Sequence, residues 1–537
     1  MKPNSPRFAA PALVQDASRR VFLRHGAVLS ALAGAGAPLA LNLLAAGSAA
    51  AQGAPDYRAI VCLFLFGGND TYNTVLATDG HNGAGAPAAG SSWAAYVATR
   101  NQAPDPIALL APGVAADGTA TAGTPARLGG VLPIAPLAAQ GRTFALHPLL
   151  GELRTMFDTD RRLAIVANVG PLVMPTSKAQ YGSATHPKPA RLFSHNDQQS
   201  TWQALAPEGA TRGWGGRMGD ALAAMNTNAV FTAVSASGSA VWLNGNSVQQ
   251  YQVSTSGAIR LGANAGGQVY GSTAVAEALN RIVGAARGGH VLQADVAGVS
   301  QRAIAAEATL RTALVPSSDA RVGTAPVSGN YNANTDPKLT YLNPLTGAQA
   351  ANGLAQQFQV VARMIEAGMR GATGARRQVF FVSQGGFDTH DLQNRNHADL
   401  MARVNQALRY FDTTLGNLGA RNLVTTFTAS DFGRTFTSNG DGTDHGWGAH
   451  HFVMGGAVRG GDLYGTFPVL ATKNAGNNNF DGSPDQLGNG SLLPATSVDQ
   501  LAATLGTWFG LSGTQLADIF PNLANFDAAA RNLGFMT

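Results

Sequence analysis

The stretch that decides the fold is Ile60-Val61-Cys62-Leu63-Phe64-Leu65-Phe66, an uninterrupted apolar run that leads into Gly67-Gly68-Asn69-Asp70. Comparable runs rich in Val, Ile, Phe and Leu recur at about 58–66, 162–168, 377–383, 422–428 and 451–455. A strand that is apolar throughout is buried on both faces, which is typical of a parallel sheet covered by helices. The sequence therefore predicts an α/β fold with a mostly parallel central sheet.

Helical spacing of apolar residues appears between several of these runs, notably over 351–370 and 397–417. Two other regions have the composition of insertions. The first, 80–140, is rich in Ala, Gly and Pro, and the second, 240–345, combines a Gly/Ser/Asn-rich start, a helical stretch near 272–314 and a polar loop. We therefore expect one large domain over 52–537 with insertions at about 80–140 and 240–345.

The amino terminus has the pattern of an export signal. Ser18-Arg19-Arg20-Val21-Phe22-Leu23-Arg24 is a twin-arginine motif, a weakly apolar Gly/Ala/Leu run follows from about 26 to 46, and Ala49-Ala50-Ala51 precedes Gln52. This pattern resembles a Tat signal with a small-residue cleavage site, so we expect 1–51 to be removed by the Tat export route and the mature chain to be periplasmic or secreted. The alternative is an uncleaved membrane anchor, since the run approaches spanning length.

Charge is sparse and concentrated in this signal. The 537 residues include 36 Lys and Arg against 31 Asp and Glu, a formal charge of +5, and only 12% of them are charged. Without 1–51, the remaining 486 residues carry 31 basic and 30 acidic residues, a net charge of +1. No basic run with interleaved aromatic residues remains, so we expect neither nucleic-acid binding nor, after cleavage, membrane association. The single cysteine, Cys62, lies inside the first apolar run and is expected in the core.

Asp and His residues follow the predicted strands. Asp70 follows the first strand, Asp388 and His390 follow the 377–383 strand, and Asp431 follows the 422–428 strand, with Asp444 and His445 soon after. Parallel strands end at one edge of a sheet, where ligands bind. Carboxylate oxygen and imidazole nitrogen suit Zn²⁺, Mn²⁺ or Ca²⁺, so these loops predict a shared divalent-metal site. Taken singly, each Asp also fits a helix cap or a turn.

Ser194 is the candidate nucleophile. It lies at the predicted start of a helix that runs through Trp202, where the positive end of the helix dipole favours an anionic ester. An equally good interpretation is a helix N-cap, with Asp197 at the third helical position completing a box-like cap. A hydroxyl at a helix start can serve both purposes.

Taken together, several motifs resemble the DUF1501 family of exported bacterial proteins, which belongs to the alkaline-phosphatase-like, or sulfatase-like, superfamily. The resemblance covers most of the chain outside the two insertions. It is carried by the Tat signal, Gly67-Gly68-Asn69-Asp70 with Asn73, His147-Pro148, Ser194-His195 with Gln198, Gly213-Trp214-Gly215-Gly216-Arg217, Phe387-Asp388-Thr389-His390, Ser430-Asp431-Phe432-Gly433-Arg434, Thr443-Asp444-His445-Gly446, and the tail from Val498-Asp499-Gln500 to Phe520-Pro521-Asn522-Leu523.

The resemblance implies a three-layer α/β/α sandwich with a metal pocket at the carboxyl edge of its sheet. It also implies hydrolysis of phosphate or sulfate esters, with Ser194 in the nucleophile position. By position, the metal ligands would be Asp70, Asp388, His390 and Asp431, with Asp444 and His445 as further candidates. Phe432 occupies the place of a second late-strand ligand, so His445 supplies the missing imidazole, or the site holds one metal or none.

Two functions remain open at this stage. In the first, the chain hydrolyses small anionic esters through Ser194 or a water bound to the metal, with His195 as general acid or base and Arg434 or Lys178 stabilising an oxyanion. In the second, the chain is a non-catalytic member of the fold that serves as a periplasmic or cell-surface binding or assembly protein. The substituted ligand at Phe432 favours the second hypothesis, and the retained Asp and His residues favour the first. Nothing in the sequence specifies the oligomeric state.

Overall fold

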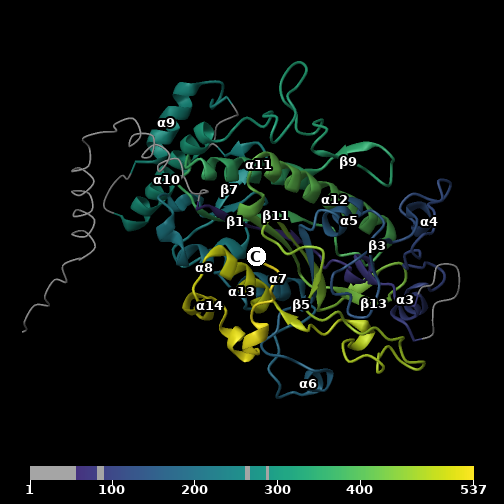
Figure 1. Cartoon of the computed structure of the whole chain (residues 1–537). Helices are drawn as coiled ribbons and strands as arrows, with labels where there is room; N and C mark the ends of the chain where they lie inside the picture. The colour runs from purple at the N-terminus through teal and green to yellow at the C-terminus, as the bar shows by residue number, and fades with distance from the viewer. Residues whose placement is uncertain (1–55, 81–89, 260–265, 286–289) are drawn as a thin grey trace, which may run out of the picture. The chain divides into compact units, whose positions relative to one another are not determined.

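A ten-stranded sheet forms the centre of the molecule in the computed structural model, which describes residues 56–80, 90–259, 266–285 and 290–537 (Figure 1). The predicted export signal, 1–51, lies outside these ranges. Residues Tyr57–Thr537 form one compact unit. Within the described ranges, no helix combines the length and apolar character needed to cross a membrane.

Strand β1 (Arg58–Leu65), the apolar run singled out in the sequence, lies in the middle of the sheet. It pairs in parallel with β11 (Arg377–Gln384) on one side and β12 (Val424–Ser430) on the other. Cys62 pairs with Phe381 and Phe427, and Leu65 with Gln384 and Ser430, so the three strands end together. This register brings the loops after β1, β11 and β12 to one edge, as the sequence predicts.

The outer strands make the sheet mixed. On one side of β1 and β11 lie three further strands, β6 (Ala233–Ser235), β7 (Tyr251–Ser254) and β8 (Gly257–Ala258). On the other side, next to β12, lie β15 (Ala449–Gly455), β5 (Leu163–Gly170) and β16 (Leu463–Tyr464), with β17 (Thr496–Ser497) beside β5. The expected strand at 451–455 forms as β15 but runs antiparallel to both neighbours, so it begins at the edge where β12 ends.

Side chains of β1 alternate between two hydrophobic clusters, one on each face of the sheet. Val61 and Leu63 belong to the cluster that includes α11 (Gly353–Met369) and α12 (Gln393–Asn417). Cys62 and Phe64 belong to the cluster that includes α8 (Trp214–Ala221) and α13 (Val498–Phe509). Figure 1 shows α11 and α12 on one side of the strands and α8 and α13 on the other. Period-two alternation therefore explains why the whole run is apolar: each face of β1 is covered by helices. Cys62 is a buried, free cysteine, as expected.

The remaining elements surround this sheet. The other helices are α3 (Ser92–Arg100), α4 (Pro125–Leu128), α5 (Gly151–Asp158), α6 (Lys178–Gly182), α7 (His195–Ala204), α8 (Trp214–Ala221), α9 (Thr273–Val283), α10 (Val291–Ala313), α13 (Val498–Phe509) and α14 (Gly513–Ile519). The smaller sheets are made of β2 (Val75–Ala77), β4 (Phe144–Leu146) and β3 (Leu132–Ile134); β9 (Thr340–Leu342) and β10 (Gln349–Ala351); and β13 (Arg434–Ser438) and β14 (Thr443–His445).

The two regions predicted as insertions contribute to these sheets. Strand β3, from the 80–140 region, pairs with β4, and β7, from the 240–345 region, pairs with β6 at the edge of the main sheet. Helix α3 also comes from the first region. Parts of both regions therefore pair with strands of the framework, and their assignment as insertions stays a prediction.

The centre of β1 should dominate stability. Leu63 is fully buried, so we expect Leu63→Ala to lower the free energy of unfolding by about 2–5 kcal/mol through lost burial and a cavity. The matched control is Leu137→Ala, at a side chain that is 73% exposed, for which we expect a change within about 0.5 kcal/mol. Urea denaturation followed by circular dichroism measures both. Equal effects of the two substitutions would contradict this account of the core.

Candidate metal centre

At the end of β1, the backbone lies very close to the loops that follow β11 and β12. Gly67 has φ +114°, and a Cβ there would lie 2.3 Å from the backbone nitrogen of Asp388. A Cβ on Gly68, with φ +88°, would lie 2.4 Å from the Phe432 ring. Only glycine accepts both the positive φ and the contact. The Gly67-Gly68 pair therefore lets the loops after β1, β11 and β12 meet.

Three imidazoles surround one carboxylate at this edge. Nε2 of His195 lies 3.3 Å from Oδ2 of Asp388, and Nε2 of His390 and of His445 lie 3.1 Å and 3.4 Å from its Oδ1. The two latter nitrogens are themselves 3.1 Å apart. We call His195, Asp388, His390 and His445 the histidine cluster. Single ligand atoms from His195, Asp388 and His445 lie within 4.8 Å of one another, a spacing that suits a shared ion.

The other ring nitrogen of each imidazole is held by an acceptor. Nδ1 of His195 lies 2.7 Å from Oδ2 of Asp431, Nδ1 of His445 lies 2.8 Å from the carbonyl oxygen of Phe193, and Nδ1 of His390 lies 3.3 Å from Oδ1 of Asp444. An acceptor at Nδ1 places the proton there and leaves the lone pair on Nε2. Burial also lowers the pKa of His445, which favours its neutral form.

This arrangement fits a cation. With the proton on Nδ1, the Nε2 lone pairs of His390 and His445 would face each other at 3.1 Å and the Asp388 carboxylate at 3.1–3.4 Å. Such a group of acceptors repels unless a cation or extra protons lie between them. Nitrogen and carboxylate donors with anchored imidazoles are the donor set that Zn²⁺ prefers. These residues could therefore hold a cation.

Arg434 fixes the central carboxylate. Its fully buried guanidinium donates to Oδ1 of Asp388 at 2.7 Å, to the carbonyl oxygen of Gly67 at 3.2 Å, and to Thr443. Partial burial alone would raise the pKa of Asp388, but the Arg434 hydrogen bond and charge hold that pKa below its usual value. These bonds show that Arg434 holds Asp388 in place, and its role toward an oxyanion stays a prediction.

Asp431 contacts the cluster through His195. Its side chain is fully buried, and its Oδ2 accepts hydrogen bonds from Nδ1 of His195 and from Nε2 of Gln199, each at 2.7 Å. Its Oδ1 has no hydrogen-bond partner among the described residues. The hydrogen bond and charge of Asp431 raise the pKa of His195, with partial burial opposing them. Gln199 lies one helical turn after His195 on α7. Its contact with Asp431 was not predicted, because a single glutamine in a helix does not by itself indicate a functional site.

The carboxylate of Asp70 forms an ion pair with Arg100 and is not one of the groups that meet in the histidine cluster. Arg100 reaches its two oxygens at 2.5 Å and 3.0 Å, and Nε2 of Gln393 donates to it at 2.6 Å. Both Asp70 and Arg100 are fully buried. Asp70 also caps the short helix that follows, accepting from the Tyr72 backbone N–H at 3.2 Å. The predicted ligand Asp70 is thus the partner of an arginine that comes from α3, in the region that had been set apart as an insertion.

Ser194 is the N-cap residue of α7, and the described residues offer its hydroxyl no capping hydrogen bond. The box-like cap with Asp197 is absent, since the Asp197 carboxylate accepts from the Glu208 backbone N–H at 3.2 Å. The preceding loop is strained: Phe193 has φ +70°, a conformation that non-glycine residues rarely adopt. Ser194 is half-buried and lies between Phe193 and His195, both of which contact the cluster site.

The other residues considered from the sequence lie outside the cluster. The Lys178 ammonium donates to the carbonyl oxygens of Phe480 and Ser483. His450 and His451 are buried, and burial lowers the pKa of each to about 3.

Phe432 forms a wall of the site, because its ring centroid lies 4.9 Å from that of His195 and 4.6 Å from that of His445. The imidazole of His445 therefore lies beside Phe432, and its role as the missing ligand stays a prediction.

Comparison with known families finds one match. A model described as "Protein of unknown function (DUF1501)" matches residues 57–520. The chain belongs to the DUF1501 family. No curated protein matches. The matched range includes every residue of the histidine cluster and also both regions that were predicted as insertions, so Arg100 and α3 lie inside the family's own domain.

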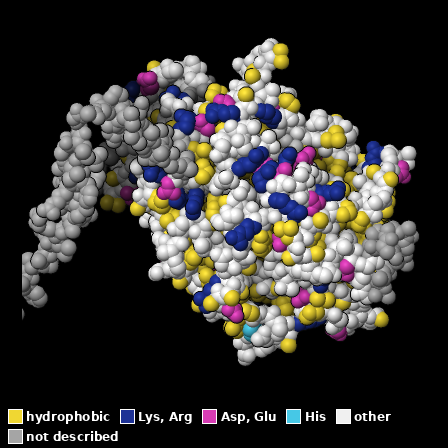
Figure 2. Space-filling model, in the orientation of Figure 1, with side chains coloured by type: hydrophobic (Ala, Val, Ile, Leu, Met, Phe, Trp, Pro, Cys, Tyr) yellow, Lys and Arg dark blue, Asp and Glu magenta, His cyan; other side chains and the backbone are white. Residues whose placement is uncertain are grey.

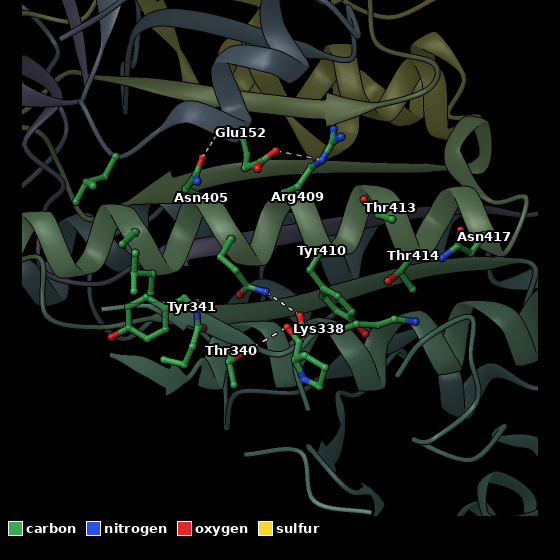
Figure 3. A pocket seen from close by; sticks show the side chains of 16 residues that line it. Glu152, Lys338, Thr340, Tyr341, Asn405, Arg409, Tyr410, Thr413, Thr414 and Asn417 are labelled. Atoms are coloured by element: carbon green, nitrogen blue, oxygen red, sulfur yellow. Dashed lines mark hydrogen bonds and ion pairs between the residues drawn. The ribbon is translucent and has the colours of Figure 1, made fainter. Parts of the chain in front are cut away.

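A separate cavity of about 550 Å³ lies along the carboxyl-terminal half of α12 in this DUF1501 protein (Figure 3). Its walls include α5 and the 337–349 segment, and it shares no residue with the histidine cluster. Arg409 and Glu152 form an ion pair at 3.3 Å beside it, and Gln406 donates to the Lys338 carbonyl oxygen at 2.7 Å. On the face shown in Figure 2, described Lys and Arg side chains are interspersed with Asp and Glu and form no continuous basic band.

The buried Asp70–Arg100 pair gives a stability prediction. Arg100→Leu leaves a buried carboxylate without its cation, so we expect the free energy of unfolding to fall by about 3–5 kcal/mol. Adding Asp70→Asn should restore part of the loss, because the unpaired charge is then removed. Arg154→Leu is the matched control, since Arg154 is 47% exposed and lies 3.7 Å from Asp158, and it should cost at most about 1 kcal/mol. Urea midpoints test this; additive losses in the double variant would contradict the pairing.

Proposed function

We propose that this DUF1501 protein is an exported, metal-dependent hydrolase of phosphate or sulfate esters with an alkaline-phosphatase-like three-layer α/β/α fold. The observation that carries the proposal is the convergence of His195, Asp388 and His445 on one point at the carboxyl edge of the sheet. The central strands with helices on both faces support the finer fold, since that edge is where α/β enzymes bind ligands. The twin-arginine pattern supports Tat export and a periplasmic or secreted location.

His195, Asp388 and His445 would hold the ion, with His390 as the fourth donor. Three nitrogens and one oxygen favour Zn²⁺ over Ca²⁺ or Mn²⁺, because the latter two prefer oxygen ligands. When bound, such an ion polarises an ester oxygen and lowers the pKa of a hydroxyl or water. This assignment moves His195 from the expected general acid or base into the ligand group, because its Nε2 faces Asp388 and its Nδ1 is taken by Asp431.

Protein groups around this point would bind and orient the ester. The amino end of α7, ten residues long, directs the positive end of its dipole at Ser194. Strain at Phe193 and the bond from the Phe193 N–H to Oε1 of Gln198 at 2.7 Å hold the Ser194 backbone in place. Phe432 excludes water from one side of the site. Ser194, with its hydroxyl released from capping, is the nucleophile that this arrangement favours.

One observation favours a second function. The sequence predicted Asp70 as a metal ligand, but the Asp70 carboxylate forms an ion pair with Arg100. Arg434 likewise uses one oxygen of Asp388. A chain whose carboxylates are paired with arginines in this way could have the fold of the enzymes without their activity, and could serve as a binding or assembly protein in the periplasm or at the cell surface. Metal content separates this alternative from the hydrolase.

Metal binding is the first test of the proposed function. We expect the purified mature protein to bind one Zn²⁺ per chain and His445→Ala to weaken that binding at least tenfold, because a ligand and its anchor on Phe193 are lost. His290→Ala is the matched control, since His290 is exposed and lies on α10's amino end, outside the cluster. Isothermal titration calorimetry and elemental analysis measure the binding. Stoichiometric zinc in His445→Ala with unchanged affinity would show that the assignment is wrong.

Ester hydrolysis is the second test. The zinc-loaded protein should cleave aryl esters of phosphate or sulfate, and Ser194→Ala should lower kcat by at least about 100-fold while zinc content stays the same. The nearby Ser200→Ala, whose hydroxyl bonds the Pro207 carbonyl oxygen, is the serine control and should retain activity. Zinc binding without turnover of any such ester would favour the non-catalytic alternative.

A further inference from the structure

The charges around the histidine cluster constrain the ligand that can bind there. We propose, resting on the proposed function, that the site takes esters carrying a single negative charge and discriminates against dianionic phosphate monoesters. The shared chemistry is a tetrahedral oxyanion with one charge, as in a sulfate monoester or a phosphodiester. The discrimination arises from how the charged side chains are paired.

Acidic groups outnumber basic groups at the cluster. Asp388 contacts the imidazoles directly, Asp431 contacts His195, and Asp444 contacts His390. Arg434, paired with Asp388 at 2.7 Å, is the guanidinium bonded to this group. When the imidazoles ligate an ion in their neutral form, the three carboxylates and one guanidinium carry a net charge of −2.

Neighbouring charges cancel in pairs. Arg100 and Asp70 neutralise each other in the protein interior. On α7 and the loop before it, Arg191 lies 3.7 Å from Asp197, so this arginine, 72% exposed, is matched by an acid at the helix start. The lysine considered for an oxyanion, Lys178, is hydrogen-bonded to two carbonyl oxygens. Among the described ion pairs, the charges left at the cluster are therefore those of its own side chains, together with the α7 dipole.

A bound divalent ion brings the net charge of the histidine cluster and its neighbours from −2 to about zero. The ion would offset the charge of −2, and the amino end of α7 adds roughly half a positive charge. A monoanionic ester then meets a slightly positive site, whereas a dianion leaves an uncompensated charge beside the carboxylates of Asp388 and Asp444. Asp388 and Asp444 are 45% and 50% exposed, so both carboxylates are accessible from solvent. Repulsion at such distances changes affinity several-fold per unit charge.

Ligand binding to zinc-loaded Ser194→Ala protein tests the inference without relying on turnover. At pH 8, phenyl sulfate and diphenyl phosphate carry one negative charge, and phenyl phosphate carries two. We expect isothermal titration calorimetry to give at least tenfold tighter binding for a monoanion than for phenyl phosphate. Phenyl sulfate binding more tightly than diphenyl phosphate would identify a sulfate ester as the source of the oxyanion, and the reverse order would identify a phosphodiester.

A charge variant adds a second readout. Asp444→Asn removes one carboxylate from the rim and should reduce the preference for monoanions about fivefold, mainly by strengthening phenyl phosphate binding. Asp295→Asn on exposed α10 removes the same charge outside the cluster and should leave the preference unchanged.

The two proposals fail in different ways. Absence of stoichiometric zinc in the loaded protein overturns the proposed function and the inference with it. Zinc binding with equal or tighter affinity for phenyl phosphate, or with no measurable affinity for any of the three esters, overturns the inference and leaves the metal centre standing. An equal response of Asp444→Asn and Asp295→Asn would also overturn it, because the preference would then not arise at the cluster.

Discussion

The bond between the buried guanidinium of Arg434 and the carboxylate of Asp388 organises the site. It holds one Asp388 oxygen at the point where the Nε2 atoms of His390 and His445 meet. The same guanidinium bonds the carbonyl oxygen of Gly67 and Thr443, so it ties the loops after β1 and β11 to the β13–β14 hairpin. A fully buried cation needs such partners to offset its desolvation. The Arg434 guanidinium therefore joins these loops to the Asp388 carboxylate.

A chain with few charges places several of them in the interior, each beside a partner. Asp70 lies against Arg100, and Asp431 lies against His195 and Gln199. Burial makes an unpaired ion costly, so these pairs determine which acids remain available to a ligand. Asp70 is thereby paired with a cation inside the protein, while Asp431 contacts His195. Local pairing, more than net charge, therefore describes the electrostatics of this protein.

Much of the framework could be predicted from apolar patterning. The five apolar runs form β1, β5, β11, β12 and β15, and the helical spacing near 351–370 and 397–417 forms α11 and α12. The antiparallel direction of β15 could not be predicted, because a strand buried on both faces has the same composition in either direction. The role of α3 was missed for a similar reason, since the Arg100 on its last turn meets Asp70 only through the fold.

The sequence alone determined that an all-apolar strand leads into Gly67-Gly68 and that Asp and His residues follow its neighbours. Those facts depend on local chemistry: strand burial requires apolar residues on both faces, and a positive φ with close contacts requires glycine. Only the tertiary structure decided which of these acids contact an imidazole. Asp388 and Asp70 both follow strands and both pair with an arginine, yet only Asp388 also meets the histidines. Pairing between side chains distant in sequence depends on the packing of whole elements, which no local pattern encodes.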